Sequence, residues 1–276
     1  MTRRSLARHL ETFGFEACAV VVGPDGVRDR CGDTHRQRPL RSVTKPLTGI
    51  ACLLAVQAGH VTLEDAAGPE GSTLRHLLAH ASGLFYESDR VLQAPGTRRG
   101  YSNRGIDVAA QHVERAVGVP FGDWVRRVLL EPLGMHGVRW TGSAAVGAFG
   151  SAEDLALLCG ELLRPRLLDA ALHAEATTAQ FPDLEGIMPG FGKQTPNPFG
   201  LGLEIRGEKT PHWTGSQNSP RTVGHFGMAG SAFWVDPDAD LALALGTDHE
   251  FCDTHRRCTP ALSDAVLEIH RERIDP

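Results

Sequence analysis

The chain of 276 residues is 41% hydrophobic and 22% charged, and its formal net charge at pH 7 is −5. This is the composition of an ordinary globular protein with enough apolar residues for a substantial core. The acidic balance and the lack of a dense basic run argue against a nucleic-acid partner, and no apolar stretch approaches the length of a membrane span. We therefore expect neither a nucleic-acid nor a membrane partner.

The N-terminal stretch MTRRSLARHLETFGFEA begins with basic residues, but no continuous apolar segment follows them. It therefore differs from a secretory signal, and the sequence predicts a helix over residues 5–13 of a cytoplasmic protein. Six cysteines are scattered along the chain. In a reducing compartment, we expect them to be free thiols.

The next segments predict two strands around a Pro-Asp-Gly turn, in ACAVVVGPDGVRDRC, followed by a buried helix. Pro46 cannot sit deep inside a helix but is tolerated in a first turn, so it marks the helix start, and the apolar run after it ends at Gly59. Ser42 is thereby placed at the helix N-terminus, where unpaired backbone N–H groups can bind an oxyanion.

Lys45 is one of only three lysines among the 28 basic residues, and it follows Ser42 by three positions. A guanidinium stays charged at ordinary pH, whereas a desolvated ammonium can lose its proton. A lysine one helical turn from a serine is therefore a candidate base beside a candidate nucleophile. The S-x-x-K match is only suggestive by itself, and a solvated surface lysine is the alternative interpretation.

Residues 73–140 and 154–163 are rich in helical patterns, and residues 181–222 predict ordered loops over a site. Strands are predicted in GLGLEIRG, RTVGHFGM, SAFWVDP and DLALALGTD, the last two forming a hairpin that turns at Asp236–Asp240. The C-terminal helix is predicted in PALSDAVLEIHRERI, with Pro260 near its first turn. Strands near both ends, with helices between them, indicate a sheet lobe and an inserted helical lobe.

The stretch HEFCDTHRRC places His249, Cys252, His255 and Cys258 at a regular spacing of three. On a helix these side chains lie along a line and cannot converge on one ion, so a zinc site would need an irregular loop. We predict no metal here. His76 and His80 have helical spacing, but Leu77 stands where a zinc protease has glutamate, which excludes that class.

Several motifs, taken in order, resemble the serine beta-lactamase and penicillin-binding-protein superfamily. The resemblance is strongest to the branch of class C beta-lactamases, D-alanyl-D-alanine carboxypeptidases and family VIII esterases, and to actinobacterial serine hydrolases. The matching segments are SVTK at 42–45, HLLAHASGL at 76–84, PGTRRGYSNRG at 95–105, EPLGM at 131–135, FGLGLEI at 199–205 and GHFGMAGS at 224–231. Short matches in a fixed order make the resemblance specific.

This resemblance implies a mixed α/β (α+β) fold, in which terminal helices flank an antiparallel sheet and a mainly α lobe lies beside it. We expect one domain over residues 1–276, with a sheet lobe of about residues 1–60 and 165–276 and a helical lobe of about residues 61–164.

The resemblance also implies a site between the lobes. Ser42 is expected to be the acylated nucleophile, with Lys45 and Tyr101 as the proton-transfer pair. The residues expected to bind substrate are Asn103, His225, Gly227 and Met228. Asn103 is also expected to orient Lys45, and the backbone N–H of Met228 is expected to complete the oxyanion hole with that of Ser42. No cofactor is implied, and which of Lys45 and Tyr101 is the base stays open.

One departure from the family pattern favours an esterase or amidase over a beta-lactamase. His225 stands where most beta-lactamases have lysine, and an imidazole is a weaker carboxylate anchor than an ammonium. Arg98, Arg99 or Arg221 remain as other anchors, and His212 in HWTG is a rival for the third motif, with Trp213 as a candidate substrate wall.

The sequence thus predicts a serine hydrolase that forms an acyl-enzyme with small esters or amides. The alternatives are a weak beta-lactamase or D-alanyl-D-alanine carboxypeptidase and, in another class, a non-catalytic binding protein of the penicillin-binding type. The oligomeric state is not specified by any sequence feature.

Overall fold

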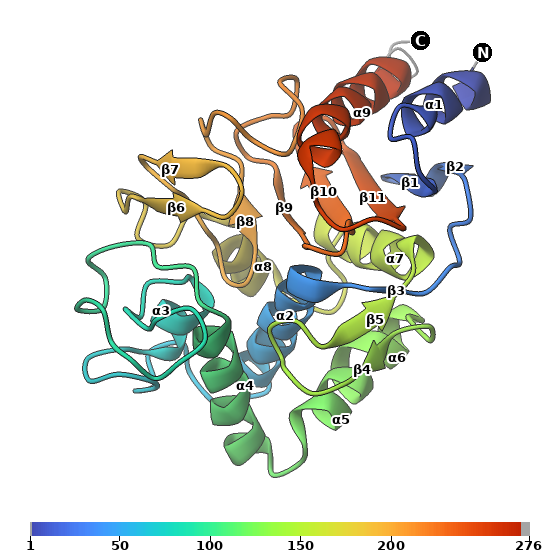
Figure 1. The fold of residues 1–276 in the computed structure, drawn as a ribbon. Helices are drawn as coiled ribbons and strands as arrows, with labels where there is room; N and C mark the ends of the chain where they lie inside the picture. The colour runs from blue at the N-terminus through green and yellow to red at the C-terminus, as the bar shows by residue number, and fades with distance from the viewer. Residues whose placement is uncertain (1, 272–276) are drawn as a thin grey trace.

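An antiparallel six-stranded sheet, in the order β2-β1-β11-β10-β9-β8, organises residues 2–271, the part of the chain that this computed structural model describes (Figure 1). Its strands are β1 (Ala17–Gly23), β2 (Gly26–Cys31), β8 (Glu204–Ile205), β9 (Val223–Phe226), β10 (Ala232–Asp236) and β11 (Leu241–Thr247). The predicted hairpins β1–β2 and β10–β11 are both present. β1 pairs with β11, which brings Ala17 opposite Thr247.

Helices cover both faces of this sheet. α1 (Thr2–Glu11) and α9 (Asp253–Arg271) lie side by side on one face, and α7 (Ala152–Leu163) lies on the other (Figure 1). Alternate residues of one strand therefore enter different cores: Val21 packs in the cluster that contains α9, and Val20 packs in the larger cluster that contains α7. The mixed α/β class, with terminal helices flanking an antiparallel sheet, is confirmed.

The central helix α2 (Thr44–Gln57) is buried along almost its whole length, because it is apolar on every side. It packs against α4 (Asn103–Val117), α5 (Phe121–Val125) and α8 (Ala170–Thr177). The remaining elements are short: α3 (Leu74–Leu78), a π-helical turn over Arg126–Leu130, α6 (Glu131–Leu133), β3 (Arg38–Pro39), β4 (Arg139–Trp140), β5 (Ala148–Gly150), β6 (Gly186–Met188) and β7 (Gly192–Gln194).

Two helices pack against a different part of the fold from the lobe to which the sequence assigns them. α7, which the sequence assigns to the helical lobe, packs against β1, β10 and β11. α2, which it assigns to the sheet lobe, packs among the helices. The chain between the lobes therefore crosses twice, and the turn that precedes α2 lies where the two parts meet.

Three helix limits differ from the sequence prediction. α1 spans Thr2–Glu11 instead of residues 5–13. α9 begins at Asp253, so Pro260 lies inside the helix rather than in its first turn. The proline removes one backbone donor, but Leu262, Val266 and Leu267 continue the buried face beyond it. The helical pattern over residues 73–84 shortens to α3, because His80, with a φ of 55°, turns the chain away. α8 was not predicted.

Candidate active site

Ser42 lies in a single 3-10 turn, η1 (Arg41–Val43), that leads directly into α2. Pro46 falls in the first turn of α2, as the sequence predicts. Arg41, just before the serine, has a φ of 49°, a conformation that non-glycine residues adopt at an energetic cost. The turn aims the Ser42 side chain at a small cavity of about 30 Å³, so its hydroxyl is mostly buried but reachable.

Lys45 is fully buried one turn further along α2. Its Nζ lies 3.0 Å from Ser42 Oγ and donates to the carbonyl of Ala145 at 3.2 Å. Burial lowers the pKa of Lys45 to about 7, while the carboxylates of Asp107 and Glu87 act in the opposite direction. Near neutral pH a large share of the protein therefore carries an uncharged amine beside the serine hydroxyl.

The loop that holds Lys45 is itself clamped by α4. Asp107 accepts hydrogen bonds from the hydroxyl of Ser143 at 2.9 Å and from the backbone N–H of Ala145 at 3.2 Å. Thr48, in the next turn of α2, donates to the carbonyl of Ala144 at 2.5 Å. Asp107 thus acts on Lys45 in two ways: through its charge, and through its hydrogen bonds to the loop whose Ala145 carbonyl accepts a hydrogen bond from Lys45.

Tyr101 reaches the same place from the start of α4. Ser102 caps this helix by accepting from the N–H of Gly105, and it donates to the carbonyl of Phe85. The Tyr101 ring lies 4.8 Å from Lys45 Nζ, and its hydroxyl lies 3.4 Å from Nε2 of His225. Burial raises the pKa of Tyr101 above its ordinary value, against the effect of a hydrogen bond with Ser42. Tyr101 therefore stays protonated while Lys45 titrates.

Asn103, the first residue of α4, is buried beside this pair. Its amide Nδ2 donates to Glu87 at 3.3 Å, and its Oδ1 has no hydrogen-bond partner among residues 2–271. Lys45 is held instead by Ser42 and Ala145. A buried amide oxygen without a donor is an available acceptor for a further N–H group.

His225, on β9, borders the cavity opposite Tyr101. Its Nδ1 lies 2.8 Å from the carbonyl of Phe226, which can only accept, so Nδ1 carries the proton and Nε2 faces the Tyr101 hydroxyl as an acceptor. Burial, followed by the charge of Lys45, lowers the pKa of His225 to about 4. The imidazole is therefore neutral at pH 7.

Gly227 and Met228 follow β9 and bring the chain back to the serine turn. A Cβ at Gly227 would lie 2.3 Å from the carbonyl oxygen of Leu40, so only glycine permits this approach. Met228 lines the cavity that Ser42 lines, and its carbonyl is held by the N–H of Phe251 at 2.9 Å. Of the seven sequence-predicted site residues, four line this cavity: Ser42, Tyr101, His225 and Met228. Lys45 contacts Ser42, whereas Asn103 and Gly227 are not among the lining residues.

The profile of the Beta-lactamase family matches residues 33–257 of this sequence. A solved Mycobacterium bovis structure, described as a beta-lactamase, is 50% identical, covers 95% of this chain and 99% of its own, and superposes with a TM-score of 0.93. The chain belongs to the beta-lactamase family.

Structures of more distant members share the fold of this beta-lactamase family protein. EstCE1, a hydrolase with promiscuous acyltransferase activity, is 18% identical over 96% of this chain and 99% of its own, with a TM-score of 0.78. Simvastatin synthase LovD from Aspergillus terreus is also 18% identical, over 98% of both chains, with a TM-score of 0.78. Among curated proteins, the comparison finds no match.

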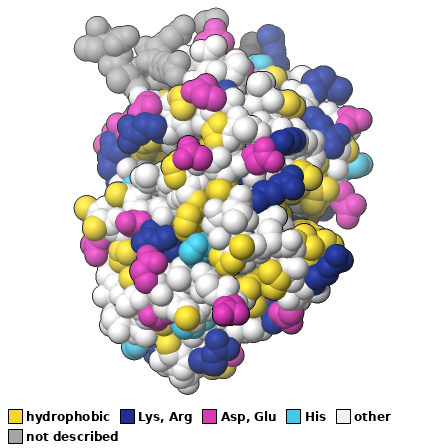
Figure 2. Space-filling model, turned by 90° about the vertical axis from the view of Figure 1, so that its left-hand side faces the viewer, with side chains coloured by type: hydrophobic (Ala, Val, Ile, Leu, Met, Phe, Trp, Pro, Cys, Tyr) yellow, Lys and Arg dark blue, Asp and Glu magenta, His cyan; other side chains and the backbone are white. Residues whose placement is uncertain are grey.

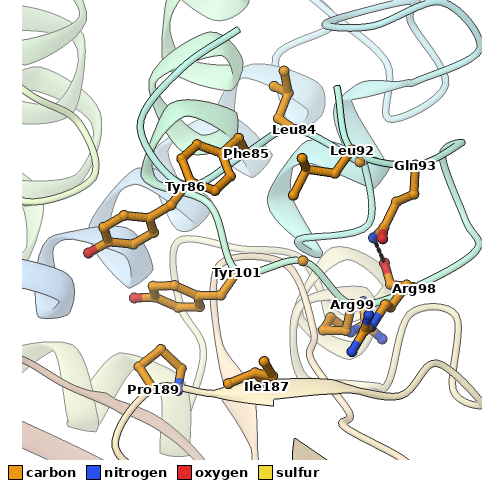
Figure 3. A pocket seen from close by; sticks show the side chains of 12 residues that line it. Leu84, Phe85, Tyr86, Leu92, Gln93, Arg98, Arg99, Tyr101, Ile187 and Pro189 are labelled. Carbon is orange, nitrogen blue, oxygen red and sulfur yellow. Dashed lines mark hydrogen bonds between the residues drawn. The ribbon is translucent and has the colours of Figure 1, made fainter. Parts of the chain in front are cut away.

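A second, larger cavity of about 270 Å³ adjoins the serine site of this beta-lactamase family protein. The two cavities share Tyr86, Tyr101 and Pro189 as walls. Figure 3 shows Tyr101 between Tyr86 on one side and Pro189 on the other, with the two tyrosine hydroxyls pointing the same way. On the face that carries α3 and the β6–β7 hairpin, hydrophobic side chains gather near the middle and charged ones border them (Figure 2).

Of the three arginines considered as carboxylate anchors, two are engaged elsewhere. Arg221 is exposed and pairs with Asp238 at 2.7 Å. Arg99 is buried, and its guanidinium donates to the backbone carbonyls of Ala79, Gln180, Phe181 and Asn197. Arg98 lines the larger cavity and is exposed there.

Sequence reasoning missed a buried ion pair behind His225. Glu204, on β8, accepts from Lys209 at 2.6 Å, from His212 at 2.9 Å and from the indole N–H of Trp213 at 2.5 Å. These charges hold the pKa of Glu204 well below its ordinary value, despite its burial. His212 and Trp213 thus support the wall of the site, and His225 is the histidine that lies beside Tyr101.

We expect Glu204→Ala to lower the free energy of unfolding by about 3–5 kcal/mol, because it leaves Lys209 charged, buried and without its carboxylate. Urea denaturation measures the loss. The matched control is Glu185→Ala, which removes an exposed pair with Lys193 and is expected to leave the free energy of unfolding almost unchanged. Equal losses for the two variants would contradict this prediction.

His80 was also missed as a neighbour of the site. Its buried ring lies 4.5 Å from the ring of Tyr101, and its Nδ1 accepts from the N–H of Ser102 at 3.2 Å. Burial keeps the pKa of His80 well below its ordinary value, so the ring is neutral. It packs Tyr101 in place.

The His249–Cys258 stretch forms the loop before α9 and its first turns. Cys252 donates its backbone N–H to Nδ1 of His255, and Thr247 contacts Nε2 of the same ring at 2.9 Å. Within residues 2–271 no group of three His, Cys, Asp or Glu side chains is placed to hold a metal ion. The six cysteines, all within this range, form no disulfide, and none of the described helices is long and apolar enough to cross a membrane.

Proposed function

We propose that this protein is a serine hydrolase that cleaves small esters through an acyl-enzyme on Ser42. The observation that carries the proposal is the 3.0 Å contact between Ser42 Oγ and Lys45 Nζ, whose pKa burial lowers to about 7. A serine hydroxyl becomes an effective nucleophile when a neighbouring base takes its proton during attack. Buried, uncharged Lys45 supplies that base.

In the proposed mechanism, Oγ of Ser42 attacks the ester carbonyl carbon while its proton passes to Nζ of Lys45. The resulting oxyanion is held by the backbone N–H groups of Ser42 and Met228. As the tetrahedral intermediate collapses, the bond to the leaving oxygen breaks, and that oxygen takes the proton of the Tyr101 hydroxyl, which the Lys45 ammonium replaces. A water molecule then repeats the attack on the acyl-enzyme, with the same groups moving the protons.

Asn103 and His225 have supporting roles in this proposal. The unpartnered Oδ1 of Asn103 accepts from the Lys45 ammonium that forms during attack, or from the N–H of an amide substrate. Neutral His225 accepts from Tyr101 and so orients its hydroxyl. Gly227 permits the close approach that sets the N–H of Met228 beside the serine turn.

The choice of esters over beta-lactams rests on the lack of a fixed cation beside the nucleophile. His225 is neutral at pH 7, because its pKa is lowered to about 4. Arg99 is bound to backbone carbonyls, and Arg221 is paired with Asp238. A beta-lactam carboxylate therefore finds a weaker partner here than an ammonium would provide.

The test compares p-nitrophenyl acetate with nitrocefin at pH 7.5. We expect the ester to be turned over many times per protein molecule, with a kcat/KM at least about a hundredfold higher, the difference of a lost charge-assisted anchor. A nitrocefin kcat/KM above that of every short ester would favour the beta-lactamase alternative. Release of no more than one p-nitrophenolate per molecule would favour a binding protein.

The pH dependence provides a separate check. kcat/KM should rise through one ionisation near pH 7, the pKa of about 7 to which burial lowers Lys45, because the protonated amine cannot accept the serine proton. The groups that face Lys45 are Asp107 on α4 and Glu87, His80 and His225 from other segments, and both histidines are neutral. Below the midpoint, activity should fall tenfold per pH unit.

Asp107→Asn should move that midpoint to lower pH. The carboxylate of Asp107 raises the pKa of Lys45, so its removal lets the amine lose its proton more readily, while the amide oxygen still accepts from Ala145. Asp123→Asn, a neutralised exposed carboxylate on α5, is the control and should leave the midpoint in place. An unchanged or higher midpoint in Asp107→Asn would contradict the assignment of Lys45 as the titrating base.

A further inference from the structure

The larger cavity beside the serine site has walls that are mainly apolar. Its lining residues are Gly83, Leu84, Phe85, Tyr86, Leu92, Gln93, Arg98, Arg99, Gly100, Tyr101, Ile187 and Pro189. At about 270 Å³ it is close to the lower end of the roughly 300–1,000 Å³ typical of small-molecule sites. Figure 3 shows Leu84, Phe85 and Leu92 on one side of it and Ile187 and Pro189 on the other.

Several of these walls leave large apolar side chains in water. Phe85 is 43% exposed, Leu92 52% and Ile187 59%. Contiguous apolar surface of this kind, concave and beside a reactive group, is stabilised when an apolar ligand covers it. Arg99 is engaged by backbone carbonyls and Arg98 is exposed to water, so the surface left for a ligand is mainly apolar and suits an uncharged apolar group.

The cavity is held open by contacts that need no ligand. The guanidinium of Arg99 is buried against backbone carbonyls, and the N–H of Arg99 donates to the carbonyl of Glu185 at 2.9 Å, next to β6. At the other end, a Cβ on Gly83 would lie 2.0 Å from the carbonyl oxygen of Gln93, so glycine permits the two ends of this loop to meet. The cavity is thus preformed.

The position of Tyr101 determines which part of an ester substrate enters the larger cavity. The carbonyl oxygen must point to the N–H groups of Ser42 and Met228, and the leaving oxygen must lie near the hydroxyl that protonates it, that of Tyr101. Tyr101 is also a wall of the larger cavity. The group on the leaving oxygen therefore extends past Tyr101 into that cavity.

The acyl group is left with the smaller space. The cavity lined by Ser42, His225 and Met228 measures about 30 Å³, which is room for about two water-sized groups. A small acyl group such as acetyl therefore suits this space better than a long acyl chain does. The two cavities, of about 270 and 30 Å³, share Tyr101 as a wall.

Resting on the proposed function, we propose that the substrates are esters of short acids with bulky, uncharged, apolar alcohols, and that the cavity between Leu92 and Ile187 binds the alcohol part. In this class of substrate, kcat/KM rises with the size of the alcohol part and falls with the length of the acyl chain.

The experiment uses two ester series, and the hydrolysis of each ester is monitored by titrating the acid that it releases. Acetates of ethanol to 1-hexanol and of 2-naphthylmethanol vary the alcohol, and ethyl esters of acetic to octanoic acid vary the acyl group. We expect kcat/KM to rise about three- to fourfold per methylene added to the alcohol, the value of a buried methylene. It should fall as the acyl chain grows beyond acetyl.

Two truncations and one control locate the effect. Leu92→Ala and Ile187→Ala should each lower kcat/KM for hexyl acetate about tenfold and reduce the slope of the alcohol series. Both side chains are exposed, so folding is preserved. Leu157→Ala on α7, where Leu157 is 41% exposed and lines neither cavity, should leave both series unchanged.

A binding measurement separates the two proposals. Calorimetry with 2-naphthylmethanol on Ser42→Ala, with and without Leu92→Ala, should show binding that the second substitution weakens about tenfold. Ester turnover with a flat alcohol series, or a kcat/KM that rises with acyl length instead, would overturn this inference and leave the proposed function standing. No turnover of any ester and no acylation of Ser42 would overturn both.

Discussion

Ser42→Ala is expected to lower kcat/KM for p-nitrophenyl acetate by about 10⁴- to 10⁶-fold, the range seen when a catalytic nucleophile is deleted. The variant keeps the cavity, the oxyanion donors and the fold, since the side chain loses one oxygen. It loses the atom that forms the acyl-enzyme. The residual rate is what positioning and the oxyanion hole supply on their own.

Mass spectrometry of the intact protein gives the second readout of this prediction. A fluorophosphonate should add once to the wild type and not to Ser42→Ala. Ser88→Ala is the control, because Ser88 is an exposed serine on the loop beside the site, and this variant should be labelled like the wild type. Labelling of Ser42→Ala, or retention of more than about a tenth of the activity, would end the proposed mechanism.

Lys45→Arg is expected to lower kcat/KM by about 10³-fold or more, nearly as much as Lys45→Ala, although it keeps a cation in place. The guanidinium cannot give up its proton at working pH, so it cannot accept the proton of Ser42. It is also larger than the ammonium, and the slot around Lys45 is fully buried. Charge alone therefore does not replace the lysine.

The pH profile distinguishes loss of a base from misplacement. In Lys45→Arg, the rise of kcat/KM near pH 7 should vanish from whatever activity remains. Lys193→Arg is the matched control, because Lys193 is exposed and pairs with Glu185, and it should behave like the wild type. If Lys45→Arg kept most of the activity, the lysine would supply only an electrostatic field, and another group would take the proton.

Sequence reasoning could name the candidate site residues more completely than their surroundings, because local motifs carry the proposed reacting groups. Ser42 and Lys45 are three residues apart, and Tyr101 and Asn103 share one helix start. The rarity of lysine that draws attention to Lys45 applies equally to Lys209, which is also fully buried. Lys209 was missed because its partner Glu204 looks like one polar residue in an apolar strand pattern.

Groups that act through the tertiary structure could not be predicted. Asp107 reaches Lys45 through a loop that includes Ala145, and no sequence pattern connects these three positions. The strands of the sheet were predicted because short apolar runs and the turn residues that bound them specify strands locally. The limits of α3 and α9 depend on packing instead, which overrides the effect of Pro260 on local helix preference.

The pairing of β1 with β11 has a consequence for the order in which a ribosome makes this protein. β1 emerges early, but the strand that lies beside it in the centre of the sheet comes only with residues 241–247. Contacts so far apart in sequence form late, and β10 and β9 join the sheet through β11. A nascent chain that has passed residue 101 already carries Ser42, Lys45 and Tyr101, but it lacks β9, whose His225 and Phe226 line the cavity beside Ser42. The proposed serine site is therefore complete only when synthesis of the described fold is nearly complete.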